Sequence, residues 1–112
     1  MAGKFDLKMS ASGKYMFNLK SGNGQIILSS QQYENKSSAE NGIESVRKNA
    51  GDDSRYERKE SKSGEPFFVL KGANGQVIGT SEMYSGNAAM ENGIESVKKN
   101  GPSAEILDNT QG

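Results

Sequence analysis

The sequence predicts an α+β fold in which two tandem β-β-β-α-β units form one continuous antiparallel-type sheet, with swapped C-terminal strands and two helices packed on it. The first observation behind this prediction is an internal repeat, because Asn41–Asn49 returns almost letter for letter as Asn92–Asn100. The second is that three short strand-like segments separated by glycine turns precede the repeated stretch, the first of which, Phe5–Met9, alternates apolar and polar residues. The chain is therefore a duplication with a period of about 51 residues.

The length of the chain and the positions of the repeated segments define one domain with two repeats. At 112 residues the chain fits a single domain, 1–112, and we divide it into repeat 1 at 1–53 and repeat 2 at 54–112. Three-stranded sheets with one helix are near the lower limit of independent stability, so each half needs the other. We therefore expect a monomer that acts as a fused pseudo-dimer.

The phase of the repeat indicates a shared strand. Phe5-Asp6 recurs as Tyr56-Glu57 and, one further period on, as Leu107-Asp108. An apolar residue followed by an acid thus occurs three times in a chain with two helices. The segment after each helix is therefore predicted to be the strand that opens the next copy, and a strand at about 54–61 is shared by both repeats.

Composition excludes several chemistries. The chain has no cysteine and no histidine, which removes disulfides, thiolate chemistry, the usual general base and the commonest zinc ligand. Its 14 basic and 14 acidic side chains balance, so the charge gives no strong signal for nucleic acid. We expect no enzyme, no catalytic residue, no cofactor and no metal.

The predicted location is the cytoplasm, without a membrane partner. No apolar run approaches the roughly 20 residues that a spanning helix needs. The start, Met1–Phe5, has no apolar secretory core.

The strands of the first copy are predicted in order at Phe5–Met9, Tyr15–Leu19 and Gln25–Leu28, with the last two joined through Gly22–Gly24. A two-residue loop would pair Leu19 with Leu28. A three-residue loop with a left-handed Gly24 would pair Leu19 with Ile27 instead.

We favour the three-residue loop. Phe17, Leu19 and Ile27 recur as apolar residues in the second copy and should share one face of the sheet. Leu28 would then lie on the outer face, which fits the glycine at the equivalent position, Gly79.

Each repeated stretch predicts an amphipathic helix. The apolar stripes are Ala39, Ile43, Val46 and Ala50 in the first copy and Met90, Ile94 and Val97 in the second. Ser37 with Glu40 has the spacing of a capping box, and Asn87 is the cap expected in the second copy. Both helices should end at a left-handed glycine, Gly51 or Gly101.

Small residues form a flank beside each stripe. Gly42, Ser45 and Asn49 lie together in helical projection, as do Gly93, Ser96 and Asn100 in the second copy. A glycine inside a helix costs about 0.5–1 kcal/mol against alanine, so another backbone should approach it closely. We hypothesise that the two flanks face each other, with the asparagines hydrogen-bonded near the helix ends.

Three stretches carry a resemblance to a known family: Asn18–Gln25, Ser38–Asn49 and Glu91–Gly101. Over essentially its whole length the chain resembles the YegP-like bacterial proteins. The resemblance implies one sheet built from two units that exchange their last strands, with single-unit relatives forming it as dimers. It implies no activity and no site residues. Pro66, where the first copy has Tyr15, departs from the pattern and predicts an edge or a bulge there.

Three function classes remain, in order of preference. The first is a structural or protein-interaction module with a protein partner. The second binds nucleic acid or a small ligand on the sheet surface, which for nucleic acid requires exposed rings such as Tyr15, Phe67 or Tyr56 beside lysines. The third is an enzyme without histidine or cysteine. The candidate interaction residues are six repeated side chains: Tyr33, Tyr84, Lys48, Lys99, Asn41 and Asn92.

The repeated lysines and tyrosines also have structural roles that suffice on their own. Glu44 with Lys48, and Glu95 with Lys99, have the spacing of surface ion pairs on a helix. Each tyrosine is expected to close the edge of the core with its ring.

Truncation of the two helices tests the assigned faces. Ile43→Ala and Ile94→Ala should each lower the free energy of unfolding by about 2–5 kcal/mol, because both side chains are predicted to be buried. Lys48→Ala and Lys99→Ala should stay within about 0.5 kcal/mol. Urea melts measure all four, and greater damage from the lysine changes would reverse the assigned faces.

Overall fold

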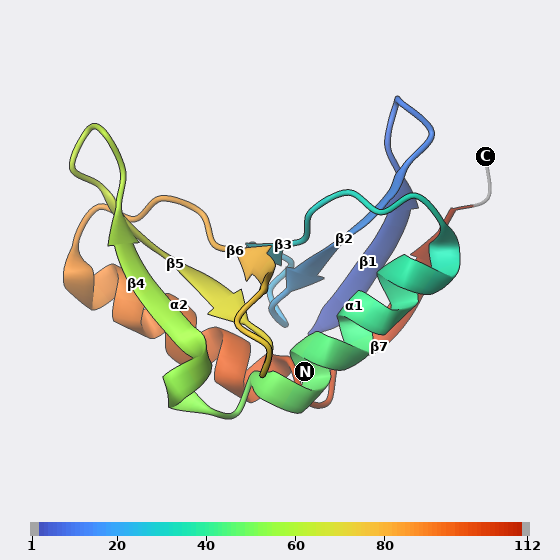
Figure 1. The fold of residues 1–112 in the computed structure, drawn as a ribbon. Coiled ribbons are helices and arrows are strands. Elements are labelled where there is room, and N and C mark those ends of the chain that lie inside the picture. Colours follow the sequence, from blue (N-terminus) through green and yellow to red (C-terminus); the bar gives the residue numbers. More distant parts are fainter. Residues whose placement is uncertain (1–2, 111–112) are drawn as a thin grey trace.

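The computed structural model describes residues 3–110. Its elements follow the predicted order in both copies (Figure 1). They are β1 (Lys4–Met9), β2 (Tyr15–Lys20), β3 (Ile26–Ser29), α1 (Lys36–Asn49), the short 3₁₀ helix η1 (Asp53–Arg55), β4 (Tyr56–Glu60), β5 (Pro66–Lys71), β6 (Val77–Thr80), α2 (Asn87–Asn100) and β7 (Glu105–Asn109).

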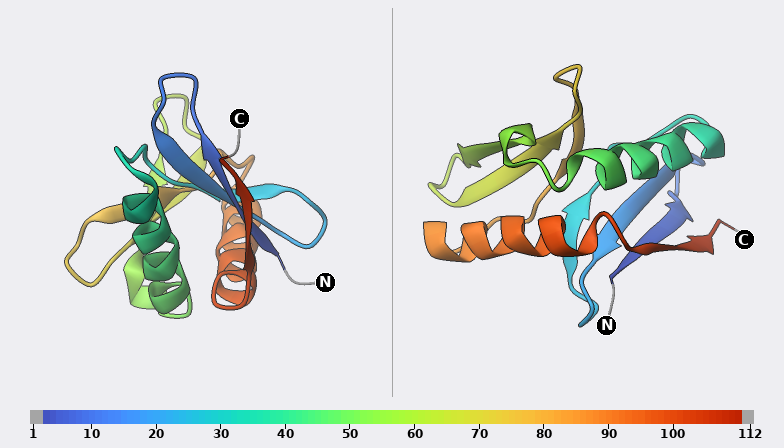
Figure 2. Two further views of the ribbon diagram at one scale, coloured as in Figure 1. Left: turned by 90° about the vertical axis from the view of Figure 1, so that its right-hand side faces the viewer. Right: turned by 90° about the horizontal axis from the view of Figure 1, so that it is seen from below.

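The strands form one seven-stranded sheet in the order β4-β5-β6-β3-β2-β1-β7. Both helices lie side by side beneath one face of this sheet (Figures 1 and 2). The predicted α+β class and the single sheet are confirmed. Six strands pair in antiparallel fashion, whereas β7 runs parallel to β1, so the sheet is mixed.

The strand that follows each helix pairs with a strand of the copy that does not contain that helix. After α1, β4 pairs with β5 of the second copy, in the way that β1 pairs with β2. After α2, β7 returns to the first copy and lies beside β1. The outer edge of β4 carries no strand within residues 3–110.

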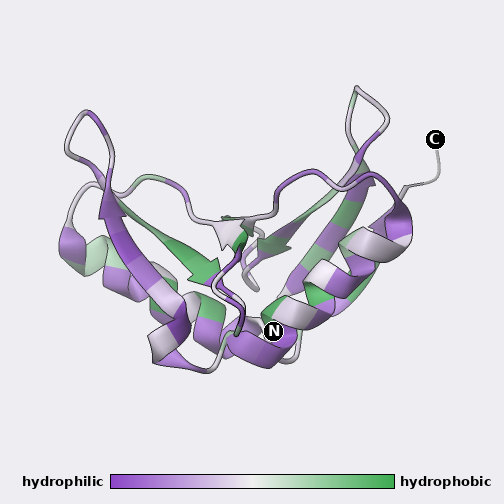
Figure 3. Ribbon diagram, in the orientation of Figure 1, coloured by the Kyte–Doolittle hydropathy of each residue, from purple (hydrophilic) through white to green (hydrophobic). Residues whose placement is uncertain are grey.

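The two copies of the opening strand differ where this coverage differs. In β1, which β7 covers, Phe5 and Leu7 are fully buried. At the equivalent positions of β4, Tyr56 turns its hydroxyl to the Ala50 carbonyl and Arg58 pairs with Glu91 on α2. Figure 3 shows β4 as hydrophilic along its length. Charge on an edge strand opposes pairing with another chain.

The core lies between the sheet and the helices. Phe17 and Phe68 occupy equivalent places in the two halves and are fully buried, together with the predicted helix stripe that includes Ile43 and Ile94. The helices also span the boundary between the copies, because α1 packs on β2 and β6, and α2 on β5 and β3. The apolar faces of both helices are as predicted.

The predicted helix caps are wrong at both ends. The α1 helix begins earlier, because Asn35 accepts a hydrogen bond from the Ser38 N–H at 2.8 Å and so takes the place expected of Ser37. The α2 cap is Gly86, which has no side chain to accept such a bond, and Asn87 is the first helical residue. Neither Gly51 nor Gly101 adopts a positive φ.

Gly101 is needed for space instead. A Cβ at this position would lie 2.7 Å from the Cβ of Ala50, its equivalent in the first copy. The ends of the two helices therefore touch through these two residues.

The β2–β3 hairpin has the predicted three-residue loop, with Gly24 at φ +86°. The predicted pairing is wrong, however. A bulge at Ile27 shifts the register, so that Leu19 lies opposite Leu28. Leu28 is fully buried rather than on the outer face, and Ile27 is also buried. The second copy has the same shift, with Leu70 opposite Gly79.

The Leu28 side chain explains the glycine at position 79. A Cβ on Gly79 would lie 2.6 Å from Cγ and from Cδ2 of Leu28. The two equivalent positions therefore face each other, and the space between them holds only one side chain.

Pro66 lies at neither an edge nor a bulge. It is the first residue of the interior strand β5, a position that tolerates proline. In the first copy, Tyr15 and Tyr33 exchange two backbone hydrogen bonds. In the second, Tyr84 donates to the Pro66 carbonyl at 2.8 Å, and the reverse bond is lost because proline has no N–H.

Three contacts hold β7 against the first copy. Lys36 pairs with Asp108 at 2.5 Å, Arg47 donates to the Ala104 carbonyl at 2.7 Å, and Asn109 donates to Asp6 Oδ1 at 2.7 Å. Burial raises the pKa of the Asp6 carboxyl, but hydrogen bonds from Asn109 and Lys20 outweigh it and leave that pKa below its ordinary value.

The Leu28–Gly79 contact predicts a rescue. Gly79→Leu should lower the free energy of unfolding by about 1–3 kcal/mol or more, because two leucines compete for one space. The exchanged double variant Leu28→Gly/Gly79→Leu should recover much of this loss, which urea melts would measure. Equal damage in the single and double variants would contradict the shared space.

Acid should weaken the attachment of β7 through Asp6. Its native pKa is depressed, so its contribution is present above the unfolded pKa of about 4 and is lost as the pH falls through the native value. Asp6→Asn should therefore flatten the fall in unfolding free energy between about pH 5 and pH 2. Glu34→Gln, at an exposed carboxylate, is the matched control. Identical acid profiles for Asp6→Asn and wild type would contradict the prediction.

Candidate functional site

The sheet splits at its centre. The β3 and β6 strands pair in antiparallel fashion at Ser29 and Thr80 alone. Continued residue by residue, the ladder would place Ile27 opposite Glu82 and Ile26 opposite Met83. Instead the strands diverge into the two wings of Figure 1, and these residues line a groove of about 970 Å³.

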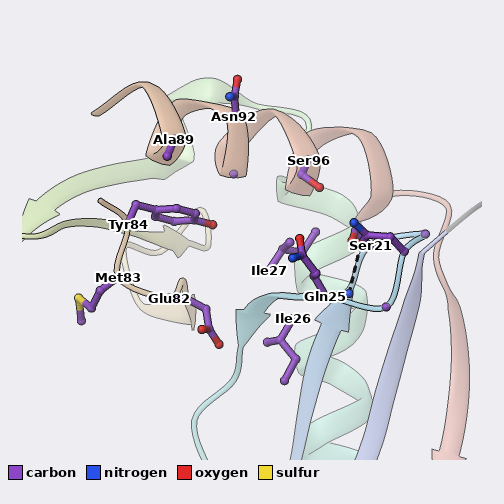
Figure 4. A pocket seen from close by; sticks show the side chains of 14 residues that line it. Ser21, Gln25, Ile26, Ile27, Glu82, Met83, Tyr84, Ala89, Asn92 and Ser96 are labelled. Carbon is purple, nitrogen blue, oxygen red and sulfur yellow. Dashed lines mark hydrogen bonds between the residues drawn. The ribbon is translucent and has the colours of Figure 1, made fainter. Parts of the chain in front are cut away.

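The groove has three walls (Figure 4). The β2–β3 hairpin, residues 21–27, forms one wall, and residues 82–84 after β6 form the opposite one. The third is α2, which presents the small residues Ala89, Gly93 and Ser96. Both copies therefore contribute to one site.

A tyrosine under a helix glycine forms part of this site. The ring of Tyr84 stacks on Phe68, with ring centroids 6.2 Å apart and planes within 10°. A Cβ on Gly93 would lie 2.6 Å from Tyr84 Cζ, so the ring requires glycine there. The predicted role of the tyrosines at the edge of the core is confirmed.

The first copy repeats this arrangement with Tyr33, Phe17 and Gly42. The helix glycines are therefore retained for tyrosine rings, and the hypothesis that the small flanks face each other is wrong. Asn49 hydrogen-bonds within its own helix, to the Ser45 carbonyl at 2.8 Å, and Asn100 does the same to Ser96.

The six candidate residues are not brought together. Tyr84 and Asn92 line the groove, although the Asn92 carboxamide points away from it (Figure 4). Asn41 and Lys48 line another hollow of about 640 Å³, beside Pro102. Tyr33 lies against α1 as described above, and Lys99 is exposed on α2.

The predicted helix ion pairs use other partners. Glu44 bonds Arg47 and Glu95 bonds Lys98, each three residues on rather than four. Arg47 also reaches β7 and Lys98 also reaches Asp53, so each basic residue joins its helix to another segment. Lys48 and Lys99 are left as surface side chains.

The groove offers neutral polar groups, apolar groups and one charge. Its neutral groups include Gln25, Ser21 and Ser96, and no lysine or arginine lines it. Glu82, the one charged lining residue, extends into the gap from the wall opposite the hairpin (Figure 4). Met83 beside it is 49% exposed, so the groove also offers an accessible apolar contact.

Burial raises the pKa of Tyr84 and of Tyr33 above the ordinary value of a phenol. Both hydroxyls therefore stay protonated at neutral pH and can exchange hydrogen bonds with a ligand. Within residues 3–110, no three acidic, histidine or cysteine side chains lie close enough to hold a metal ion. No helix in that range is long and apolar enough to cross a membrane.

The open face of the sheet, away from the helices, bears on the nucleic-acid hypothesis. Phe67 lies on this face, half-buried and opposite Lys59. Tyr15 packs against the core, and Tyr56 is buried on the helix side. One of the three rings that the hypothesis needs is therefore available.

Sequence reasoning missed most of the groove residues, above all Ile26, Glu82 and Met83. The available signal was a difference between the copies. Where the second copy has Glu82-Met83, the first has Gln31-Gln32. An acid and an exposed methionine in the second copy thus stand where the first has two neutral amides.

A family model described as Domain of unknown function (DUF1508) matches the chain twice, at residues 10–57 and 61–108. The second match begins and ends 51 residues after the first, since 61 minus 10 and 108 minus 57 both give 51. This is the period that separates the repeated helices. The predicted duplication and the YegP-like resemblance are confirmed.

Relatives match over nearly their full length. A UPF0339 protein of Bordetella pertussis is 54% identical over 111 residues, covering 99% of each chain. A UPF0339 protein YegP of Yersinia pestis is 54% identical over 108 residues, covering 96% of each.

Solved structures have the same fold. The solution NMR structure of yegP from E. coli, a protein of unknown function, aligns with a TM-score of 0.95 at 48% identity, covering 100% of this chain and 97% of its own. That of a UPF0339 protein from Shewanella oneidensis aligns at 0.90 and 48% identity, covering 96% and 92%.

The helix glycines generate a prediction opposite to helix propensity. Alanine is the better helix former by about 1 kcal/mol, yet Gly42→Ala should destabilise the protein. Its Cβ would lie 2.5 Å from the Tyr33 hydroxyl oxygen and 3.0 Å from Phe17 Cε2. Adding Tyr33→Phe should recover part of the loss in thermal melts.

Gly51→Ala is the matched control, because nothing lies within 4 Å of a Cβ there. It should be neutral or mildly stabilising. A Gly42→Ala variant as stable as wild type would show that the tyrosine does not require the glycine.

Proposed function

Because the chain belongs to the DUF1508 family, a domain of unknown function, we propose a role from its own geometry: a non-enzymatic module that binds a protein partner. The observation that carries this proposal is the groove where β3 and β6 diverge. Its volume of about 970 Å³ is at the upper end of the usual range for binding sites, which is about 300–1,000 Å³.

The lining of the groove suits a peptide. Ile26, Met83 and Tyr84 offer apolar contact, while the amide and hydroxyl groups along the hairpin and α2 offer hydrogen bonds without a fixed charge. Protein interfaces combine an apolar centre with a polar rim in this way. The exposed Met83 is a flexible contact that adapts to different apolar partners.

A non-enzymatic role is supported by the chemistry of the same lining. Nucleophilic catalysis needs a base beside the nucleophile, and the chain has no histidine or cysteine for either part. Ser21 and Ser96 in the groove form hydrogen bonds with Asn23 and Asn100, neither of which is a base. The Tyr84 phenol is protonated at neutral pH.

A protein partner is favoured over nucleic acid by the distribution of rings and charge. Binding of single-stranded nucleic acid needs stacking rings beside basic groups. Here Phe67 is the available ring on the open face, and Lys59 opposite it is paired with Glu57 at 3.8 Å. The groove itself presents an acid, which repels phosphate.

The proposed working form is a monomer in which the two copies replace the subunits of a dimer and exchange their terminal strands. Support comes from the pairing of β4 with the second copy and of β7 with the first. The partner that one unit would need is thus already attached, and the groove is assembled without a second chain.

Selection of random peptides displayed on phage tests the proposal. Peptides recovered on the wild-type protein should bind Met83→Gln more weakly, because glutamine replaces the exposed apolar contact. Glutamine is the residue that the first copy has at this place, Gln32, so the change suits the backbone. Gln32→Ala, at the equivalent position, is the matched control and should leave binding unchanged.

Amide shifts of the labelled protein locate the binding. Recovered peptides should shift resonances of the hairpin, residues 21–27, and of residues 82–84. Failure to enrich any peptide, or shifts confined to the open face of the sheet, would overturn the proposal.

A further inference from the structure

We propose that the groove receives its partner as an added strand: an extended peptide lies between β3 and residues 82–84, with a basic side chain directed at Glu82. This inference rests on the proposed function and specifies its ligand and binding mode. Three independent features of the groove carry it: free strand edges, the position of α2 and the charge of the lining.

The first feature is the backbone of both walls, which makes no ladder pairing across the gap. Ser81 and Tyr84 donate their N–H groups to Phe68 and Pro66 of β5, at 2.9 and 2.8 Å, so this segment runs along β5 as an extension of β6. Between them, the N–H groups of Glu82 and Met83 donate to no backbone carbonyl within residues 3–110.

The opposite wall is equally open. The β3 strand pairs with β2 on one side, and on the other it meets β6 at the single pair of Ser29 and Thr80. An extended peptide placed in the gap would supply hydrogen-bond partners to both walls and restore a continuous sheet. Strand addition of this kind draws affinity from main-chain bonds and specificity from alternate side chains.

The second feature is the position of α2. Side chains of an extended peptide alternate between the two faces of the sheet, and those on one face would point at α2. The helix presents Ala89 and Ser96 to the groove, and their small side chains leave room for a larger one, whereas the space beside Gly93 is filled by the Tyr84 ring. Ile27 and Tyr84 border this space, so the side chain received there is apolar.

The third feature is charge. Glu82 is the one charged residue among those that line the groove, and no basic side chain lines it. A lysine or arginine of the peptide would find an uncontested carboxylate, whereas an acidic peptide would meet repulsion. The ligand is therefore an extended peptide in which apolar residues alternate with basic ones.

The first copy provides the comparison. Its equivalent stretch is Gln31-Gln32, which carries no charge. The N–H groups of these two residues also donate to no backbone carbonyl within the described chain, so the strand edge is repeated and the charge is not. Glu82→Gln therefore gives the second copy the residue that the first already tolerates.

The experiment uses a synthetic peptide of alternating valine and lysine, capped at both ends, titrated into the ¹⁵N-labelled full chain. The expected shifts are at the amides of Ile26, Ile27, Glu82 and Met83. A second peptide is N-methylated at alternate residues, which removes the strand hydrogen bonds, and a third has glutamate in place of lysine. Both should bind at least about tenfold more weakly.

Variants separate charge from shape. Glu82→Gln should weaken the valine-lysine peptide by about five- to tenfold. Glu34→Gln, which removes an exposed acid outside the groove, should leave its affinity unchanged. This weakening in Glu82→Gln and not in Glu34→Gln, with the shifts of the wild type mapping to both walls, supports the inference.

Other outcomes overturn it. Equal binding of the N-methylated peptide would exclude strand addition, and equal binding of the glutamate peptide would exclude the role of Glu82. If none of the three peptides shifts the groove while phage-selected peptides do, the added strand is wrong and the proposed function stands. If neither set shifts the groove, both proposals fall.

Discussion

The constraint on which the structure depends is that residues made equivalent by the duplication meet each other at a pseudo-twofold axis. Ser29 pairs with Thr80, Leu28 packs on Gly79, and Ala50 touches Gly101. A side chain on such an axis meets its own equivalent, and a close-packed interior has room for one of the two. The second copy accordingly has glycine at two of these three positions. The copies differ at all three positions where these equivalent residues touch.

The central contact also explains the groove. The two halves are joined at the axis by a single pair of strand residues, and the helices hold them together because each one packs on strands of both copies. Because the helices already hold the two halves together, β3 and β6 need no further pairing beyond the axis. The β3 strand and the segment after β6 separate there, and the space between them remains open to solvent. At the outer edges the copies diverge for a related reason. Where β7 covers β1, the positions of Phe5 and Leu7 are apolar and buried, and where β4 has no cover the equivalent positions carry Tyr56 and Arg58.

Most of the architecture could be predicted because its signals are local and repeated. The 51-residue period, the apolar stripe through Ile43 and Ile94, and the turn at Gly24 each follow from spacing within one copy. The errors arose where the identity of a residue is constrained by contact with a residue from another helix, strand or loop. Gly42 is constrained by Tyr33, which lies in another segment of the same copy, and Leu28 by Gly79 across the axis. The periodicity of a single helix or strand contains neither contact.

The candidate site was harder to predict for the same reason. The repeated residues, such as Tyr33 with Tyr84 and Asn41 with Asn92, were the natural candidates because both copies keep them, yet the structure uses the tyrosines to close the core. The groove is instead distinguished by what the copies do not share, Glu82-Met83 against Gln31-Gln32. The bulge at Ile27, which directs the hairpin wall, has no sequence signal of its own, because the loop alone predicts a different register.

Fusion of two units into one chain allows the two copies to differ at Gln31-Gln32 and Glu82-Met83. A symmetric dimer of single units carries two identical grooves, so any change that adapts one for a ligand changes the other and must suit both. In the fused chain the equivalent positions of the two copies can carry different residues. The loop of the second copy comes close to α1, where a Cβ on Gly72 would lie 3.6 Å from Ser45 Oγ, while the loop of the first copy forms the wall of the groove along α2. The packing constraints at the axis and in the core apply to both copies. Glu82 and the exposed Met83 occur in the second copy alone. A shared fold in which one copy alone carries the acid and the exposed methionine is the arrangement expected if the proposed binding surface belongs to a single groove.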